Sequence, residues 1–127
     1  MKLLLFIASL FSLLVAYELD ESQLKQYINE CNGNNVESCK KVGYHYKELY
    51  DTTVINTSGH RNPDILKESI PYHKKACDKR DASACESLAL TYSELGDKAN
   101  KEEYFKKACD LKAPISCNLL GSIYRTQ

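Results

Sequence analysis

The chain has 127 residues, with 17 basic and 17 acidic side chains, three histidines and six cysteines. A charge balance this close to neutral leaves no electrostatic footprint for nucleic acid or for an anionic membrane surface, which argues against both as partners. The length suits one small domain.

The N-terminus has the pattern of a secretory signal peptide, residues 1–16. Lys2 supplies the positive charge, and an apolar run leads to Ala16, a small residue at the expected cleavage point, although the cut could fall a residue or two away. The run is shorter than the roughly 20 apolar residues of a membrane span, and an uncleaved anchor is the alternative. We therefore expect a secreted or periplasmic domain of residues 17–127, without a membrane anchor after cleavage.

The rest of the chain contains three copies of one pattern built on a pair of cysteines. Each pair has the spacing C-x7-C: Cys31 and Cys39, Cys77 and Cys85, Cys109 and Cys117. An aliphatic and a small residue follow each pair, with a tyrosine three residues further on: Val42, Gly43 and Tyr46; Leu88, Ala89 and Tyr92; Leu120, Gly121 and Tyr124. This internal repeat assigns the cysteines to the scaffold. Since cysteines of an exported chain form disulfides and each unit carries its own pair, we predict the bonds Cys31–Cys39, Cys77–Cys85 and Cys109–Cys117.

The first unit, residues 28–49, has Gly33 between its cysteines, which predicts a left-handed glycine cap at the end of its first helix. Residues 50–62 follow without a helical period, and we interpret them as a long loop that is functional or mobile. If this loop serves binding, its deletion should leave folding intact. Within it, Asn56-Thr57-Ser58 matches a glycosylation acceptor, which chance explains about as well.

The second unit contains a proline where a helix is expected before Cys77. Because proline is tolerated only in the first turn of a helix, Pro71 predicts a kink or a break. The dipeptide Asn62-Pro63 is expected to start a short turn, and Ser69 to cap a second helix that begins at Ile70.

The third unit predicts a helical hairpin. Apolar residues at helical spacing indicate helices over residues 98–110 and 115–124, and Pro114 ends the first and opens the second. A turn of about four residues then joins the helices, straddled by the C-x7-C pair. The repeated tyrosines are interpreted as packing residues between hairpins. Since one hairpin cannot bury its apolar face, the sequence predicts an all-α superhelix, a solenoid of about three disulfide-clipped hairpins.

The string KKACD-x6-C-x2-L-G/A-x2-Y resembles the Sel1-like repeat, a relative of the tetratricopeptide repeat. The added C-x7-C resembles its disulfide-rich secreted branch, the Helicobacter cysteine-rich proteins. The second and third units match closely, and the first matches at its cysteines, Val42, Gly43 and Tyr46. The cysteine pairs lie 46 and 32 residues apart, whereas a regular array repeats at roughly 36. The resemblance implies either a scaffold that binds a protein or peptide, or penicillin binding with weak β-lactamase activity on a β-lactam or cell-wall fragment.

The β-lactamase alternative requires a nucleophilic serine with a lysine one helical turn further on, in S-x-x-K, supported by S-D-N and K-T-G. The chain has two S-x-x-K matches, Ser22 with Lys25 and Ser38 with Lys41, and has neither supporting motif. Both serines also stand near expected helix starts, where capping explains them. These four residues are the catalytic candidates.

A binding surface is predicted from matched positions of the second helices whose side chains differ between units. These positions are Tyr44, Leu90 and Ser122; His45, Thr91 and Ile123; Lys47, Ser93 and Arg125. The three histidines have no metal-binding spacing and are interpreted as surface or partly packed, so we expect neither a metal nor a cofactor. One face of the last hairpin is also expected to be open to a partner. Variation spread along a face is typical of a scaffold, which makes an unidentified exported protein or peptide the expected partner.

Overall fold

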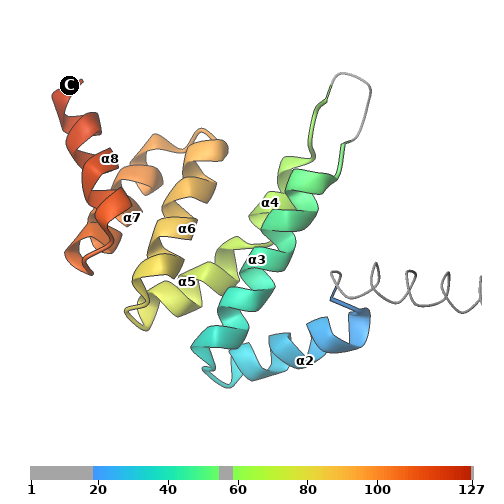
Figure 1. Ribbon diagram of the computed structural model, residues 1–127. Coiled ribbons are helices and arrows are strands. Elements are labelled where there is room, and N and C mark those ends of the chain that lie inside the picture. Colours follow the sequence, from blue (N-terminus) through green and yellow to red (C-terminus); the bar gives the residue numbers. More distant parts are fainter. Residues whose placement is uncertain (1–18, 55–58, 127) are drawn as a thin grey trace, which may run out of the picture.

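The computed structural model describes residues 19–54 and 59–126; the predicted signal peptide and the Asn56-Thr57-Ser58 acceptor lie outside the described residues. The described residues form seven helices and no strand: α2 (Glu21–Asn32), α3 (Val36–Thr52), α4 (Pro63–Lys67), α5 (Ile70–Asp78), α6 (Ala82–Glu94), α7 (Lys98–Asp110) and α8 (Pro114–Arg125). Figure 1 shows the hairpins α2–α3, α5–α6 and α7–α8 following one another in a curved row, with α4 beside α3. The prediction of an all-α solenoid is confirmed.

The three hairpin turns are identical in design and contain three residues, one fewer than expected. In each turn the second residue has a left-handed backbone: Asn34 (φ 70°), Arg80 (φ 66°) and Lys112 (φ 71°). The next residue donates its N–H to the last turn of the preceding helix, as Asn35 does to the Glu30 carbonyl at 3.0 Å. This pattern is a Schellman motif, which satisfies carbonyls at a helix end. The expectation for Gly33 was wrong, because Gly33 has φ −83° and the left-handed position falls one residue later.

The left-handed lysine in the last turn predicts a stabilising substitution. A left-handed backbone costs an L-residue roughly 1–2 kcal/mol, whereas glycine adopts it without a steric penalty. Part of this gain is offset because glycine also frees the unfolded chain. We expect Lys112→Gly to raise the free energy of unfolding by about 0.5–1 kcal/mol in denaturant titrations. Lys112→Ala, which keeps the Cβ atom, is the control and should give no gain; equal behaviour of the two variants would contradict the explanation.

Each hairpin is closed by its own disulfide, as the repeat predicts. The bonds Cys31–Cys39, Cys77–Cys85 and Cys109–Cys117 each join Cα atoms 4.6 Å apart. The Schellman turn produces this approach, since it returns the chain within three residues and faces the last turn of one helix with the first turn of the next. The cysteines of the first two bonds are buried, and those of the third are half-buried.

The break predicted at Pro71 is confirmed. The chain forms α4 and then α5, and Pro71 lies in the first turn of α5, where its missing N–H costs nothing. The Asn62 side chain caps α4 by accepting the Asp64 N–H at 3.0 Å. Ser69 precedes α5 but does not cap it through its side chain, because its hydroxyl donates to the Leu66 carbonyl at 2.7 Å. Pro114 opens α8, as expected.

Neighbouring units meet through matched aromatic contacts. Tyr46 of α3 stacks on Tyr72 of α5 with ring centroids 6.0 Å apart, and Tyr92 of α6 stacks on Tyr104 of α7 at 5.6 Å. Of the three repeated tyrosines, Tyr46 and Tyr92 therefore pack between hairpins, as expected, whereas Tyr124 is 50% exposed.

A small residue beside each junction lets the helices approach. A Cβ atom at Gly43 would lie 2.4 Å from Nε2 of His73, so glycine is required there. His73 is fully buried, which corrects its interpretation as a surface or partly packed residue. Its repeat equivalent is Phe105, which is buried in the same core as Ala89, the equivalent of Gly43.

The segment interpreted as a loop of residues 50–62 is shorter than expected, because α3 continues to Thr52. Tyr50 is buried, and its hydroxyl donates to the Glu94 carboxylate at 3.1 Å. The Arg61 guanidinium lies over the Tyr50 ring, 5.7 Å from its centroid. Deleting residues 50–62 would therefore remove a contact between the first two units, so the proposed test of the loop must spare Tyr50.

Candidate functional site

A groove between α2 and α3 brings together aromatic, basic and acidic side chains. It has a volume of about 310 Å³ and is lined by Leu19, Tyr27, Lys41, Tyr44, His45 and Glu48. The Lys41 ammonium lies over the Tyr27 ring, 4.6 Å from its centroid, which holds a positive charge at the wall of the groove. A larger depression runs along α2, but all its lining residues belong to that one helix, so it has no opposing wall.

Tyr44 of the groove also contacts two helices of the second unit, α5 and α6. Its ring meets the buried His73 ring edge-on with centroids 5.2 Å apart, and its hydroxyl accepts a hydrogen bond from Ser87 of α6 at 3.4 Å. Although these contacts fix the side chain, 43% of it remains exposed. A half-exposed aromatic ring held in one orientation binds a partner at a low entropic cost.

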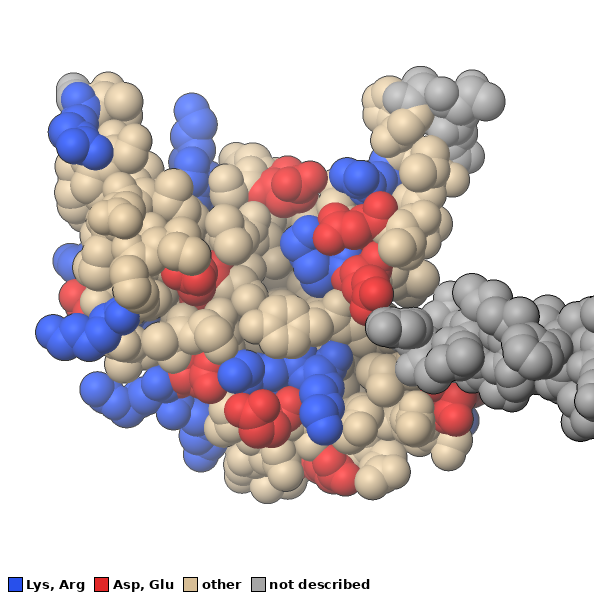
Figure 2. Space-filling view, in the orientation of Figure 1, with Lys and Arg blue, Asp and Glu red and all other residues tan. Residues whose placement is uncertain are grey.

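The second helices carry further exposed apolar side chains. Leu90 of α6, at the repeat position of Tyr44, is 44% exposed, and Ile115 and Leu119 of α8 are exposed as well. Figure 2 shows acidic and basic side chains interspersed over the visible face of the molecule, so this face carries charges of both signs. Such a mixture suits an amphipathic partner better than a strongly charged one.

The predicted binding residues do not form one continuous surface. Tyr44 and His45 line the groove, and the exposed members are Leu90, Ser93, Ser122 and Arg125. Lys47 pairs with Asp51 at 2.7 Å, and Ile123 packs against the core. Thr91 is fully buried and has no hydrogen-bond partner for its hydroxyl among the described residues, so it is not part of any surface.

Several residues of the site were missed by the sequence analysis. Tyr27 and Glu48 line the groove but do not belong to the variable positions that were compared. Tyr27 gave no signal, because its equivalents His73 and Phe105 are buried in unit junctions.

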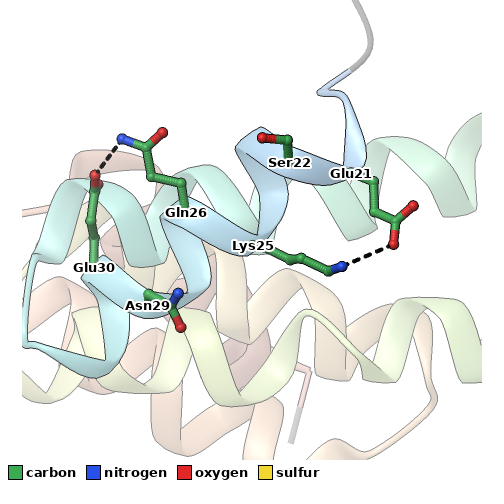
Figure 3. Close-up of a pocket in the computed structure, with 6 residues that line it drawn as sticks. All are labelled: Glu21, Ser22, Lys25, Gln26, Asn29 and Glu30. Atoms are coloured by element: carbon green, nitrogen blue, oxygen red, sulfur yellow. Dashed lines mark hydrogen bonds and ion pairs between the residues drawn. The ribbon is translucent and has the colours of Figure 1, made fainter.

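The first serine–lysine candidate pair, Ser22 and Lys25, lies on the exposed side of α2. Figure 3 shows the Lys25 ammonium turned towards Glu21, away from the Ser22 hydroxyl, and the ion pair measures 3.2 Å. Further along the same helix Gln26 donates to Glu30 at 2.9 Å. The lysine amine is therefore not placed to take a proton from the serine.

The second candidate pair is separated by the packing of α2 against α3. Ser38 is 3% exposed, and its hydroxyl donates to the carboxylate of Glu30. The hydrogen bonds from Ser38 and then Gln26 hold the pKa of Glu30 below its ordinary value, which makes this carboxylate a poor general base. Lys41 lies over Tyr27 instead. The Ser116 hydroxyl makes a similar bond to Glu86 at 2.6 Å, so serine at this repeat position has a structural role.

The described residues offer neither a metal centre nor a membrane-spanning helix. Among residues 19–54 and 59–126, no group of three or more His, Cys, Asp or Glu side chains is arranged to hold a metal ion. Within those ranges no helix has the length and apolar character needed to cross a membrane.

Fold and site together define a tetratricopeptide-like, cysteine-rich helical repeat protein with an amphipathic groove. Comparison with known proteins agrees, since residues 82–115 match the tetratricopeptide repeat family model. The matched segment spans α6, α7 and the start of α8, so it covers a helix pair that crosses the boundary between two cysteine-defined hairpins. No curated protein and no solved structure matches the chain.

Proposed function

We propose that this protein is an exported scaffold of the disulfide-rich Sel1-like type that binds a peptide segment of a partner protein in the groove between α2 and α3. The observation that carries the proposal is the fixed, half-exposed Tyr44 ring at the edge of a groove with both charges. The three disulfides support export, because such bonds persist in oxidising compartments. The tetratricopeptide match supports binding, since helical repeats present extended surfaces to partners.

The groove favours a ligand with one apolar side chain and an adjacent acidic group. The rings of Tyr27 and Tyr44 offer an apolar contact, and the Lys41 ammonium can form an ion pair with a carboxylate of the ligand. Glu48, which lines the same groove from α3 as Lys41 does, repels a second acidic group. We assign no acyl-transfer step to Ser22 or Ser38.

Selection from a random 12-residue peptide library on the oxidised protein tests this proposal. We expect peptides that combine an aromatic or aliphatic residue with an acidic one, and at least tenfold weaker binding to the Lys41→Glu variant. Ser122→Ala, at an exposed position of α8, is the matched control and should bind as the wild type does. Selected peptides that bind Lys41→Glu and wild type equally, with both proteins folded by circular dichroism, would place binding outside the groove and refute the proposal.

A further inference from the structure

The two unit junctions inside the chain use the same set of contacts. In each, a tyrosine of the preceding second helix stacks on a tyrosine of the next first helix, Tyr46 on Tyr72 and Tyr92 on Tyr104. A lysine three residues after the incoming tyrosine reaches back across the junction. Lys107 pairs with Asp78 at 3.4 Å, and the equivalent Lys75 donates to Asn32 at 3.3 Å.

The incoming helices α5 and α7 share the residues that make these contacts. Each carries a tyrosine, a second aromatic ring next to it, and then lysine and alanine three and four residues after the tyrosine: Tyr72, His73, Lys75 and Ala76 in α5, and Tyr104, Phe105, Lys107 and Ala108 in α7. The second ring and the alanine are buried in both helices. These are therefore the side chains through which the first helix of one unit packs against the second helix of the preceding unit.

The last hairpin repeats the residues that, in the two internal junctions, contact the first helix of the next unit. Leu120, Gly121 and Tyr124 repeat Leu88, Ala89 and Tyr92, and Asp110 of α7 repeats Asp78. In the described part of the chain, Tyr124 has no stacked ring and no ion pair reaches Asp110. A Cβ atom at Gly121 would meet nothing within 4 Å, although the same atom at Gly43 would collide with His73. Figure 1 shows α8 at the end of the row, opposite α2.

A second copy of this chain is a poor occupant of that face. Its helices α5 and α7 are already packed in internal junctions. Its remaining first helix, α2, has Gln26, Asn29 and Glu30 where α5 and α7 have tyrosine, lysine and alanine. Head-to-tail stacking would therefore bury the Glu30 carboxylate and leave Asp110 without a cation, which is costly.

We propose that Tyr124, Gly121, Leu120 and Asp110 form a docking surface for a partner helix that carries a tyrosine, a second aromatic residue directly after it, and lysine and alanine three and four residues after the tyrosine. The partner tyrosine stacks on Tyr124, its second ring covers Gly121, and its lysine pairs with Asp110. This surface lies on the last hairpin, so it is distinct from the groove between α2 and α3.

A labelled peptide with the sequence of residues 97–112, in which Cys109 is replaced by serine, is the probe. We expect it to bind the oxidised full chain below about 1 mM in fluorescence anisotropy, and a peptide with Tyr104→Ala to bind at least tenfold more weakly. The Gly121→Leu variant should lose at least tenfold in affinity while its melting temperature does not fall, because the space beside Gly121 is empty in the free protein. Gln23→Leu, which adds the same side chain at an exposed position of α2 at the other end of the row, is the control and should bind normally.

A charge exchange separates docking on this face from non-specific helix binding. Asp110→Lys should weaken binding of the original peptide, and a Lys107→Glu peptide should recover most of the loss on that variant. Absence of binding at 1 mM, or binding that Gly121→Leu leaves unchanged, would refute the proposal. A dimer of the wild type that Gly121→Leu converts to a monomer would also refute it, since the face would then belong to a second copy of the chain.

Discussion

Chemical reduction of the three disulfide bonds is expected to unfold the protein at about 25 °C. Each bond closes a short loop with a sequence separation of 8, which is worth about 2.5 kcal/mol in the chain-entropy model, so the three together contribute on the order of 7 kcal/mol. A domain of this size has a total free energy of unfolding of about 5–15 kcal/mol. For a free energy of unfolding in the lower half of this range, loss of the disulfides leaves almost no stability, which is the basis of the expected unfolding.

Far-ultraviolet circular dichroism during thermal melting, with and without a phosphine reductant, measures this effect. We expect the oxidised protein to melt cooperatively and the fully reduced protein to lose most of its helix before heating begins. Cys109–Cys117 should be reduced first, because its cysteines are half-buried whereas the other four are buried. A reduced protein that melts cooperatively within a few degrees of the oxidised one would show that packing alone maintains the fold.

Paired alanine variants locate the effect within the solenoid. Replacing Cys77 and Cys85 should cost more than replacing Cys109 and Cys117, because the central hairpin packs against a neighbour on both sides. Cys109 and Cys117 lie in the hairpin at one end of the row, where the helices can adjust more easily to the loss of the bond. Equal losses in the two variants would indicate that only loop entropy matters and that the position in the row does not.

The spacing of the cysteines was sufficient to predict the hairpins, the disulfides and the stacking order. These features depend on residues that are close in sequence. Because the pattern recurs three times with the same spacing, it does not arise by chance. Pro71 was equally informative, because its effect on a helix is local. The left-handed position at Asn34 was missed because the glycine next to it is the residue that favours this conformation on its own.

Long-range contacts explain the remaining errors. α3 continues through Tyr50, whose hydroxyl donates to Glu94, 44 residues further along the chain, and no local pattern reveals such a contact. Thr91 was expected at the surface, but α6 lies in the middle of the row and buries a position that its equivalents in α3 and α8 leave half-exposed. The groove depends on how α2 meets α3, so its lining could not be predicted from variation between units alone.

The burial of His73 could have been predicted by aligning the repeat units at every position, not only at the cysteines and the residues that follow them. His73 aligns with Phe105, and the alignment alone places it in a unit junction. Gly43, where the other two units have Ala89 and Gly121, then supplies the space for the imidazole. The register cannot show that neither ring nitrogen finds a hydrogen-bond partner among the described residues, because that depends on the atoms around it.

Acidification is expected to destabilise the protein through His73. Burial, and secondarily the positive charge of Lys40, lower the pKa of His73 from 6.5 to about 4. The folded state therefore keeps the ring neutral where the unfolded chain is already protonated, so the unfolded state binds more protons between pH 6.5 and pH 4. Stability then falls as the pH drops through this window, by about 3 kcal/mol, and His73 adds no further loss below the folded pKa.

Denaturant titrations of wild type and His73→Leu between pH 7.5 and pH 3.5 isolate this contribution. The neighbouring charges are Lys40 and its partners Glu37 and Asp81, and the lowered pKa of Asp81 adds its own loss of stability at lower pH. Because both proteins share these groups, the difference between their curves reports His73. We expect the gap to change by about 3 kcal/mol across the window in favour of the leucine variant. A His73→Leu curve parallel to the wild type would mean that the imidazole reaches solvent and is protonated in the folded state.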